Sequence, residues 1–131
     1  MILVDSSVWI DFFRGQDAPH VQQLEQAIRN RRDLAICGII LTETLQGIRN
    51  DTRYRQVKDH FSSLILLPME QPVFIGAADI YRTLRKQGQT IRKTNDCIIA
   101  ATAIHYRSQL LHNDRDFVVL SRHTPLELLQ A

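Results

Sequence analysis

The amino-acid sequence predicts an α/β fold in which a parallel sheet is covered by helices on both faces. Short apolar runs alternate along the chain with longer segments whose apolar residues recur three or four positions apart, as in amphipathic helices. The short runs are apolar at almost every position, which is typical of parallel strands buried on both faces. The 131 residues contain no internal repeat, low-complexity tract or linker, so we expect one domain over residues 1–131.

The expected strands are short. The first ends at Asp5 and the second at Gly38, and each is followed at once by a segment with helical periodicity. The last apolar segment of the chain could add an edge strand. The strands are expected at residues 2–4, 34–37, 64–67 and 110–111, with the possible edge strand at 126–129.

Several of the expected helices are bounded by residues that commonly begin or end helices. Ser6 and Ser7 can cap the first helix and Gly15 ends it, Gly88 ends the fifth helix, and Thr94 can cap the sixth. The helices are expected at residues 8–13, 19–32, 39–49, 51–64, 72–87 and 94–107, with a last short helix beginning near Asp114.

The composition is that of an ordinary soluble domain. Apolar residues make up 44% of the chain, enough for one core, and the net charge of +2 is too small to indicate a nucleic-acid-binding protein by itself. The two cysteines, Cys37 and Cys97, form no metal-binding pattern and suit a reducing compartment. Neither a signal peptide nor an apolar run near the ~20 residues of a membrane span is visible. We therefore expect a cytoplasmic protein that is not embedded in a membrane.

Acidic residues gather where ligands bind in parallel sheets, outside the carboxyl ends of the strands. Asp5 directly follows the first expected strand, and Asp114 and Asp116 follow the strand at 110–111. Glu43 lies about one turn into the helix after the second strand, and Asp96 lies in the first turn of the helix before the 110–111 strand. The order of the elements therefore predicts that these carboxylates converge at one edge of the sheet.

Carboxylates this close together repel one another. Two unit charges about 4 Å apart cost about 4 kcal/mol at an effective dielectric constant of about 20, so such a cluster requires a cation. Oxygen ligands select a hard ion, and we expect one or two Mg²⁺ or Mn²⁺ ions.

Each acid also has a purely structural explanation. Asp5 and Asp114 could cap helices, Asp96 and Asp116 could compensate helix dipoles, and Glu43 could pair with an arginine. The placement of all of them at one predicted edge favours the metal site.

Basic residues occur in groups on three helical segments and indicate a polyanionic substrate, because the sequestered acids leave the remaining surface positive. The group expected to bind substrate comprises Arg85, Lys86, Arg92 and Lys93.

Other chemistries lack their motifs. The chain has no histidine pair at zinc-binding spacing, no GxSxG nucleophile motif and no glycine-rich phosphate loop. An aspartyl phosphatase would need a second acid two residues after Asp5, where this chain has Ser7. A nuclease with a DNA substrate or a processing role and a non-catalytic RNA-binding domain stay open as alternatives.

Four motifs resemble the PIN domain. They are Val-Asp-Ser-Ser-Val-Trp-Ile-Asp at residues 4–11, Thr-Glu-Thr-Leu-Gln-Gly at 42–47, Thr-Asn-Asp-Cys-Ile-Ile-Ala-Ala at 94–101, and His-Asn-Asp-Arg-Asp-Phe at 112–117. The compact length resembles the VapC toxin branch of that family. The resemblance implies a three-layer α/β/α sandwich with a mostly parallel sheet and an endoribonuclease dependent on Mg²⁺ or Mn²⁺. It further implies the toxin of a type II toxin–antitoxin system, with a VapB-type antitoxin, a homodimer and a larger complex with the antitoxin.

The resemblance also implies roles for individual residues. The family's four catalytic acids fall on Asp5, Glu43, Asp96 and Asp114, and Asp116 is the frequent fifth acid of the metal site. Ser7 and Asn113 fall at positions that support the site. This chain departs from the usual pattern at Cys97 and His112, where the family more often has an aliphatic residue and a threonine or valine, respectively.

The expected mechanism is metal-assisted hydrolysis of a phosphodiester bond. One ion would be held chiefly by Asp5 and Asp96. Glu43 and Asp114 would complete the coordination directly or through water, and one of them could accept a proton from the attacking water.

Overall fold

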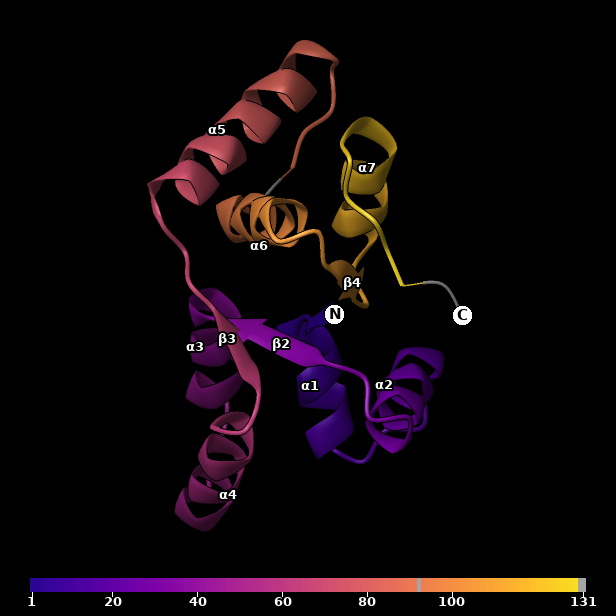
Figure 1. Ribbon diagram of the computed structural model, residues 1–131, viewed down its shortest axis with the longest axis vertical. Coiled ribbons are helices and arrows are strands. Elements are labelled where there is room, and N and C mark those ends of the chain that lie inside the picture. The colour runs from indigo at the N-terminus through magenta and orange to yellow at the C-terminus, as the bar shows by residue number, and fades with distance from the viewer. Residues whose placement is uncertain (92, 130–131) are drawn as a thin grey trace.

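A computed structural model describes residues 1–91 and 93–129 of the chain, and its centre is a four-stranded parallel sheet (Figure 1). The strands run in the order β3-β2-β1-β4 and are all parallel to their neighbours. Their bounds are β1 Ile2–Val4, β2 Leu34–Cys37, β3 Ile65–Leu67 and β4 Gln109–Leu111. These four strands confirm the expected parallel α/β sheet.

The first strand holds the central position. Leu3 of β1 pairs with Ala35 of β2 on one side and with Leu110 of β4 on the other. All three residues of β1 are fully buried, as the uninterrupted apolar run at 2–4 predicts. Because the strands are parallel, the loops that leave β1, β2 and β4 all begin at the same edge of the sheet.

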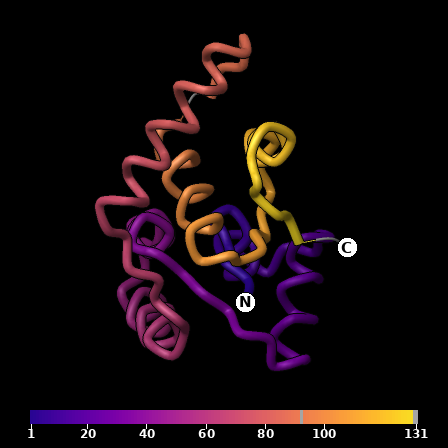
Figure 2. Tube along the Cα trace, turned by 45° about the horizontal axis from the view of Figure 1, so that its top comes forward, coloured from indigo at the N-terminus to yellow at the C-terminus, as the bar shows by residue number. Residues whose placement is uncertain are grey.

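The described residues form seven helices in two layers. In Figures 1 and 2, α1, α2 and α4 lie on one side of the sheet and α5, α6 and α7 on the other. Contacts join α1 to α2 and α3, and join α6 to α5 and α7. This arrangement confirms the expected three-layer α/β/α sandwich. The helices span α1 Ser6–Phe13, α2 Pro19–Arg29, α3 Gly38–Gln46, α4 Asp51–Phe61, α5 Gln71–Lys86, α6 Thr94–His105 and α7 Arg115–His123.

Helices α2, α3, α4 and α6 end two or three residues earlier than expected. In α2 and α6 the reason is that an arginine takes the left-handed conformation that usually marks a glycine. Arg31, after α2, has φ 54°, and the amide of Arg32 donates to the Ala27 carbonyl at 3.0 Å. Arg107, after α6, has φ 53°, and the amide of Ser108 donates to the Ala103 carbonyl at 2.9 Å. Both are Schellman-type helix ends. No glycine occurs there to signal them, so the expected ends at residues 32 and 107 were too late.

Three further expectations needed correction. Asp5, rather than Ser6 or Ser7, is the residue that caps α1, and Thr94 is the first residue of α6 without capping it. The segment 126–129 forms a single parallel bridge, Leu128 to Leu110, and not an extended edge strand. The amide of Leu110 donates to the Glu127 carbonyl and its carbonyl accepts from the Leu129 amide, both at 2.9 Å. β4 is already the outermost strand, and this short segment covers its free edge.

The core contains one large aromatic cluster below the sheet. Trp9 of α1 is fully buried and packs edge-on against Phe61 of α4, with ring centroids 5.0 Å apart, while Phe12, Phe13 and His60 surround it. These rings fix the α1 helix, and with it the residues at its N-terminus, against α4. No helix in the described part of the chain is long and apolar enough to cross a membrane.

The central strand predicts where the fold is most sensitive to mutation. Leu3→Ala should lower the free energy of unfolding by roughly 2–5 kcal/mol, because Leu3 is fully buried and the substitution leaves a cavity. Leu66→Ala, the same change in an edge strand where the side chain is 57% exposed, should cost much less. Urea denaturation of both variants measures the difference. Equal losses would show that β1 is not the centre of the core.

Candidate metal centre

Asp5 is fixed where β1 passes into α1. Its amide donates to the Leu111 carbonyl of β4 at 2.9 Å, which ties it to the sheet. Its Oδ2 accepts hydrogen bonds from the Ser7 amide at 3.2 Å and from Ser7 Oγ at 2.6 Å, as an N-cap does. The side chain is buried, and Oδ1 takes no part in these capping bonds. Asp5 is therefore both a helix cap and a member of the candidate site.

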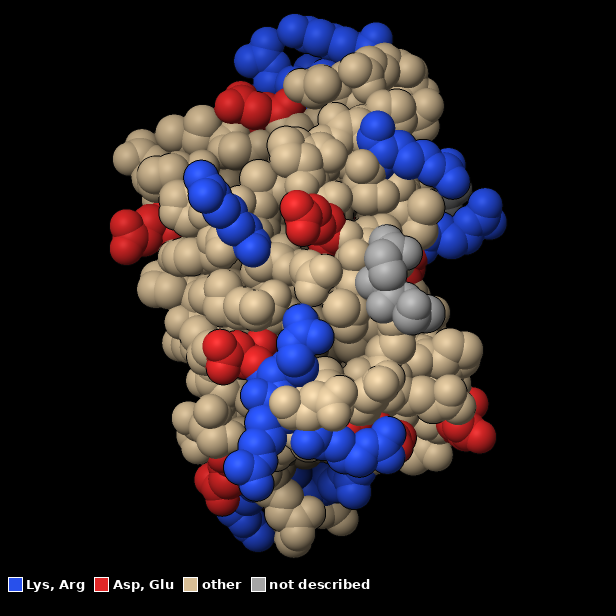
Figure 3. Space-filling model, turned by 45° about the vertical axis from the view of Figure 1, so that its right-hand side comes forward, with Lys and Arg blue, Asp and Glu red and all other residues tan. Residues whose placement is uncertain are grey.

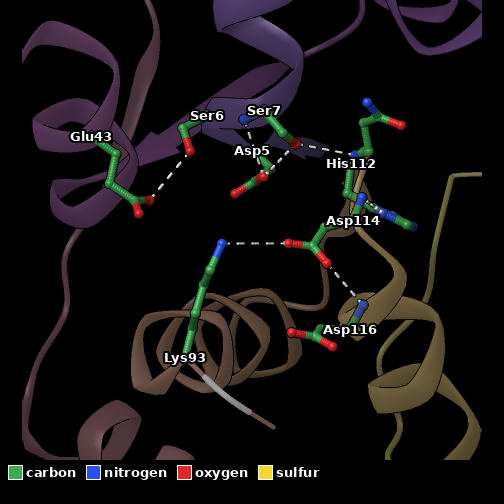
Figure 4. A network of polar contacts seen from close by, with 9 residues as sticks. Asp5, Ser6, Ser7, Glu43, Lys93, His112, Asp114 and Asp116 are labelled. Carbon is green, nitrogen blue, oxygen red and sulfur yellow. Dashed lines mark hydrogen bonds and ion pairs between the residues drawn. The ribbon is translucent and has the colours of Figure 1, made fainter. Parts of the chain in front are cut away.

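Ser7 links Asp5 to the loop after β4. Besides donating to Asp5, its Oγ accepts a hydrogen bond from the Asn113 amide at 3.1 Å. Figure 4 shows this chain of contacts crossing from the N-terminus of α1 to the segment that carries Asp114. The structure thus brings together Ser7 and Asn113, although the latter contributes through its backbone amide.

Asp114 is the N-cap of α7. Its Oδ1 accepts a hydrogen bond from the Asp116 amide at 2.9 Å. Its own amide donates to Nδ1 of His112 at 3.0 Å. Burial lowers the pKa of His112 below its ordinary value, against the opposing effect of Asp5 and Asp114, and this favours the neutral imidazole that can accept at Nδ1. Sequence analysis noted His112 only as a departure from the family; its contact with the Asp114 backbone was missed, because no pattern in the sequence signals it.

Asp96 lies in the first turn of α6 and is only 6% exposed. Its Oδ2 is buried and has no hydrogen-bond partner. A buried carboxylate oxygen without a partner is costly. Burial, with additional repulsion from Asp114 and Asp5, raises the pKa of Asp96 from 3.8 to about 7. The unpartnered oxygen and the raised pKa make Asp96 a candidate functional residue, and its carboxylate is a suitable ligand for a hard cation.

Three carboxylates form the tightest acidic group in the described part of the chain. Asp96, Asp114 and Asp116 each offer an oxygen that lies within 4.8 Å of the others; we call them the carboxylate triad. Asp5 lies outside this group but is coupled to it, because burial and the charge of Asp114 raise the pKa of Asp5 while hydrogen bonds from Ser7 lower it. The geometry therefore gives Asp116 a more central place than the sequence suggested.

In Figure 4 the side chains of Glu43 and Lys93 extend toward the space between Asp5 and Asp114. Glu43, on α3, is half-buried, and its Oε1 accepts a hydrogen bond from Ser6 Oγ at 3.3 Å. Lys93, immediately before α6, places Nζ 4.0 Å from Oδ2 of Asp114. The five predicted acids thus surround a common space at the carboxyl edge of the sheet.

Two of the other basic residues predicted to bind substrate lie on α5. Arg85 and Lys86 lie exposed in the last turn of α5, where the guanidinium of Arg85 sits 5.8 Å from the Tyr81 ring centroid. Arg92 lies outside the described residues. On the face shown in Figure 3, Lys and Arg side chains gather near both ends of the molecule, with separate Asp and Glu side chains between them. Of the described residues predicted to bind substrate, only Lys93 contacts a carboxylate.

Both cysteines are buried behind the acids, as small apolar residues would be. Burial raises the pKa of the Cys37 thiol, and the charges of Asp5 and Glu43 raise it further. Burial likewise raises the pKa of Cys97, together with Asp96 and Asp116. Both groups therefore stay protonated thiols at neutral pH, which favours a structural role over metal ligation.

Comparison with known proteins identifies the family to which this α/β/α sandwich belongs. The PIN domain matches residues 2–122, so the chain belongs to the PIN-domain family. Ribonuclease VapC11 of Mycobacterium tuberculosis and VapC ribonuclease Mb1587 of Mycobacterium bovis are each 37% identical to it over 133 residues, which cover 97% of this chain and 96% of each relative. This similarity places the chain in the VapC branch of the family.

A solved structure supports the fold. VapBC2 from Rickettsia felis, crystallised with a DNA fragment from its promoter, contains a chain that superposes with a TM-score of 0.76 and covers 98% of both chains. The two sequences are 21% identical, so this likeness concerns the fold alone.

The raised pKa of Asp96 predicts how the metal-free protein responds to pH. Between pH 3.8 and about 7, Asp96 is protonated in the folded state and ionised in the unfolded state. The free energy of unfolding should therefore fall as the pH rises through this window. Asp96→Asn removes the effect. In EDTA the variant should melt at a higher temperature than the wild type at pH 8, by about 5 °C, and at nearly the same temperature at pH 4.

Thermal denaturation followed by circular dichroism across this pH range gives the comparison. Asp79→Asn, which removes an exposed carboxylate on α5, is the control and should leave the melting temperature unchanged at both pH values. A destabilised Asp96→Asn protein at pH 8 would instead show that Asp96 serves only the N-terminus of α6.

Proposed function

We propose that this chain is a metal-dependent endoribonuclease that hydrolyses RNA phosphodiester bonds and acts as the toxin of a type II toxin–antitoxin system. The observation that carries the proposal is the carboxylate triad with its unpartnered Asp96 oxygen, on a chain that is 37% identical to VapC ribonucleases over nearly its whole length. We take residues 1–131 as one nuclease domain, since the PIN match spans almost all of them.

The site suits a hard divalent ion. Its donors are carboxylate oxygens, the ligands preferred by Mg²⁺ and Mn²⁺, and both cysteines stay thiols. Asp96, Asp114 and Asp116 would hold the ion, and the unpartnered Oδ2 of Asp96 would gain a partner. Asp5 is placed to bind the same ion or a second one with Oδ1, since Oδ2 serves the cap.

Each residue of the site then has a role. When bound, the metal supplies positive charge that makes water a stronger nucleophile and offsets charge on the phosphate. Glu43 stands across the space from the triad, and its Oε2, free of the Ser6 hydrogen bond, would accept the proton of the attacking water. Ser7 and His112 hold Asp5 and Asp114 in place through the hydrogen bonds described above.

A nuclease that cuts cellular RNA needs restraint, and we propose a VapB-type antitoxin as the partner. Support comes from solved relatives of the same fold, which are toxin–antitoxin complexes. An antitoxin that places a basic side chain near the carboxylates would offset their charge as the metal does, so antitoxin and metal should compete. A homodimer of this chain, a larger assembly with the antitoxin and a cytoplasmic location complete the proposal.

Metal dependence is the first test. Cleavage of an RNA substrate should stop in EDTA and return with Mg²⁺ or Mn²⁺. Either ion should also raise the melting temperature of the wild type, because it binds the native state preferentially. Asp96→Asn should lose both the cleavage and the metal-induced rise. Full cleavage in excess chelator would refute the metal-dependent mechanism.

Toxicity is the second test. Expression of the wild type in a bacterial host should arrest growth, whereas Asp5→Asn, expressed to the same soluble level, should not. Co-expression of a VapB-type protein encoded beside the toxin should restore growth, and sequencing of RNA ends after brief induction should locate the cuts. Harmless wild-type protein at high soluble expression would contradict the toxin role and leave the nuclease role to the cleavage assay.

A further inference from the structure

We propose that Lys93 is a built-in counter-ion of the carboxylate triad. In the absence of RNA it competes with the divalent ion for Asp114, and it moves to an RNA phosphate when substrate binds. The inference rests on the proposed function, because it assumes a metal-dependent nuclease acting on RNA. It assigns Lys93 a role that couples the binding of metal to the binding of RNA.

The position of Lys93 brings its charge to the triad. It is the N-cap residue of α6, three residues before Asp96, and its extended backbone (φ −116°, ψ 116°) places it outside the helix. Its Nζ lies 4.0 Å from Oδ2 of Asp114, the oxygen that takes no part in capping α7. Its charge also lowers the pKa of Asp96, against the larger effects that raise it. Lys93 therefore acts on two members of the triad, which come from different helices.

The ion pair between Lys93 and Asp114 is weak enough for another ion to displace Lys93. The side chain of Lys93 is 66% exposed, its distance to Asp114 is that of a loose ion pair, and the ammonium group is carried on a flexible stem. A divalent ion carries twice the charge and can bind three carboxylates at once, so it would displace Lys93. The displaced ammonium would still lie close to the ion and repel it, so Lys93 should weaken metal binding in the absence of RNA.

A phosphate gives the displaced lysine a new partner. RNA approaching the triad meets negative charge, and Lys93 is the only cation that the described residues place in contact with it. Ammonium groups bind phosphate as point charges and need no fixed geometry. Once Lys93 pairs with phosphate, it no longer competes for Asp114. RNA should therefore strengthen metal binding, and metal should strengthen RNA binding by the same factor.

The first experiment measures Mn²⁺ binding to the RNA-free protein by isothermal titration calorimetry at low salt. Lys93→Met should bind Mn²⁺ roughly three- to tenfold more tightly than the wild type, the size expected for one charge near the ion in a solvent-exposed setting. Lys93→Arg, which keeps the charge, should bind like the wild type. Lys58→Met, with the same loss of charge at an exposed position on α4, should also bind like the wild type.

The second experiment measures RNA binding in the presence of Mn²⁺, in an Asp5→Asn background that does not cleave. Adding Lys93→Met should weaken binding and reduce the slope of log K against log salt by about one, because one phosphate contact is lost. RNA should raise Mn²⁺ affinity in the Asp5→Asn protein and should raise it less in the double variant.

The outcomes separate the inference from the proposed function. Unchanged Mn²⁺ affinity in Lys93→Met, with clear binding to the wild type, would overturn the role of Lys93 and leave the metal-dependent nuclease standing. Tighter Mn²⁺ binding combined with an unaltered salt slope would overturn the transfer to phosphate. Absence of any Mn²⁺ binding to the wild type would overturn the proposed metal site and the inference with it.

Discussion

Repulsion among carboxylates at the carboxyl edge of the sheet is the constraint on which the rest of the site depends. Asp96 shows its effect, since repulsion from Asp114 and Asp5 adds to the larger effect of burial in raising the pKa of this group to about 7. The fold maintains the cluster because Asp5 and Asp114 each use one oxygen to cap a helix. At Asp5, the hydrogen bonds from Ser7 lower the pKa against the larger effect of burial, which raises it. The capping explanation and the metal-site explanation of Asp5 and Asp114 are therefore compatible, because one oxygen of each carboxylate caps a helix and the other is available to a metal ion.

The capping bonds also orient the site. Ser7 joins Asp5 to the Asn113 amide, and His112 joins the Asp114 amide to its own ring, so the two ends of the acidic cluster are connected through short polar contacts. The Ser7–Asp5 contact lies where β1 passes into α1, the His112–Asp114 contact lies where β4 passes into α7, and the Ser7–Asn113 bond joins the two. The aromatic cluster around Trp9 holds α1 from below. Loss of that packing would move Asp5 without touching any carboxylate.

The sequence predicted the sheet and the edge at which the acidic residues lie, because both follow from order along the chain. Apolar runs fix the strands, and acids that follow parallel strands must share an edge. Distances within the edge do not follow from order. The pairing of Asp116 with Asp96 depends on how α7 packs on α6, which no local pattern encodes. The helix ends at Arg31 and Arg107 were missed for a different reason, since an arginine takes the left-handed conformation there and glycine is its usual signal.

The position of the basic residues relative to the acids also could not be predicted from the order of the chain, and this position matters for substrate binding. In the sequence, nothing distinguished Lys93 from Arg85 and Lys86. The structure places Lys93 at the carboxylate triad, whereas Arg85 and Lys86 lie at the exposed end of α5. Exposed charges are screened over about 8 Å at physiological salt. Distant arginines can therefore attract RNA to the protein but cannot offset the negative charge that a phosphate meets at the triad. Only a cation in contact with the carboxylates can do so. A nuclease that binds a polyanion through an acidic centre thus needs positive charge within that centre, which the metal would supply and which Lys93 already provides in part.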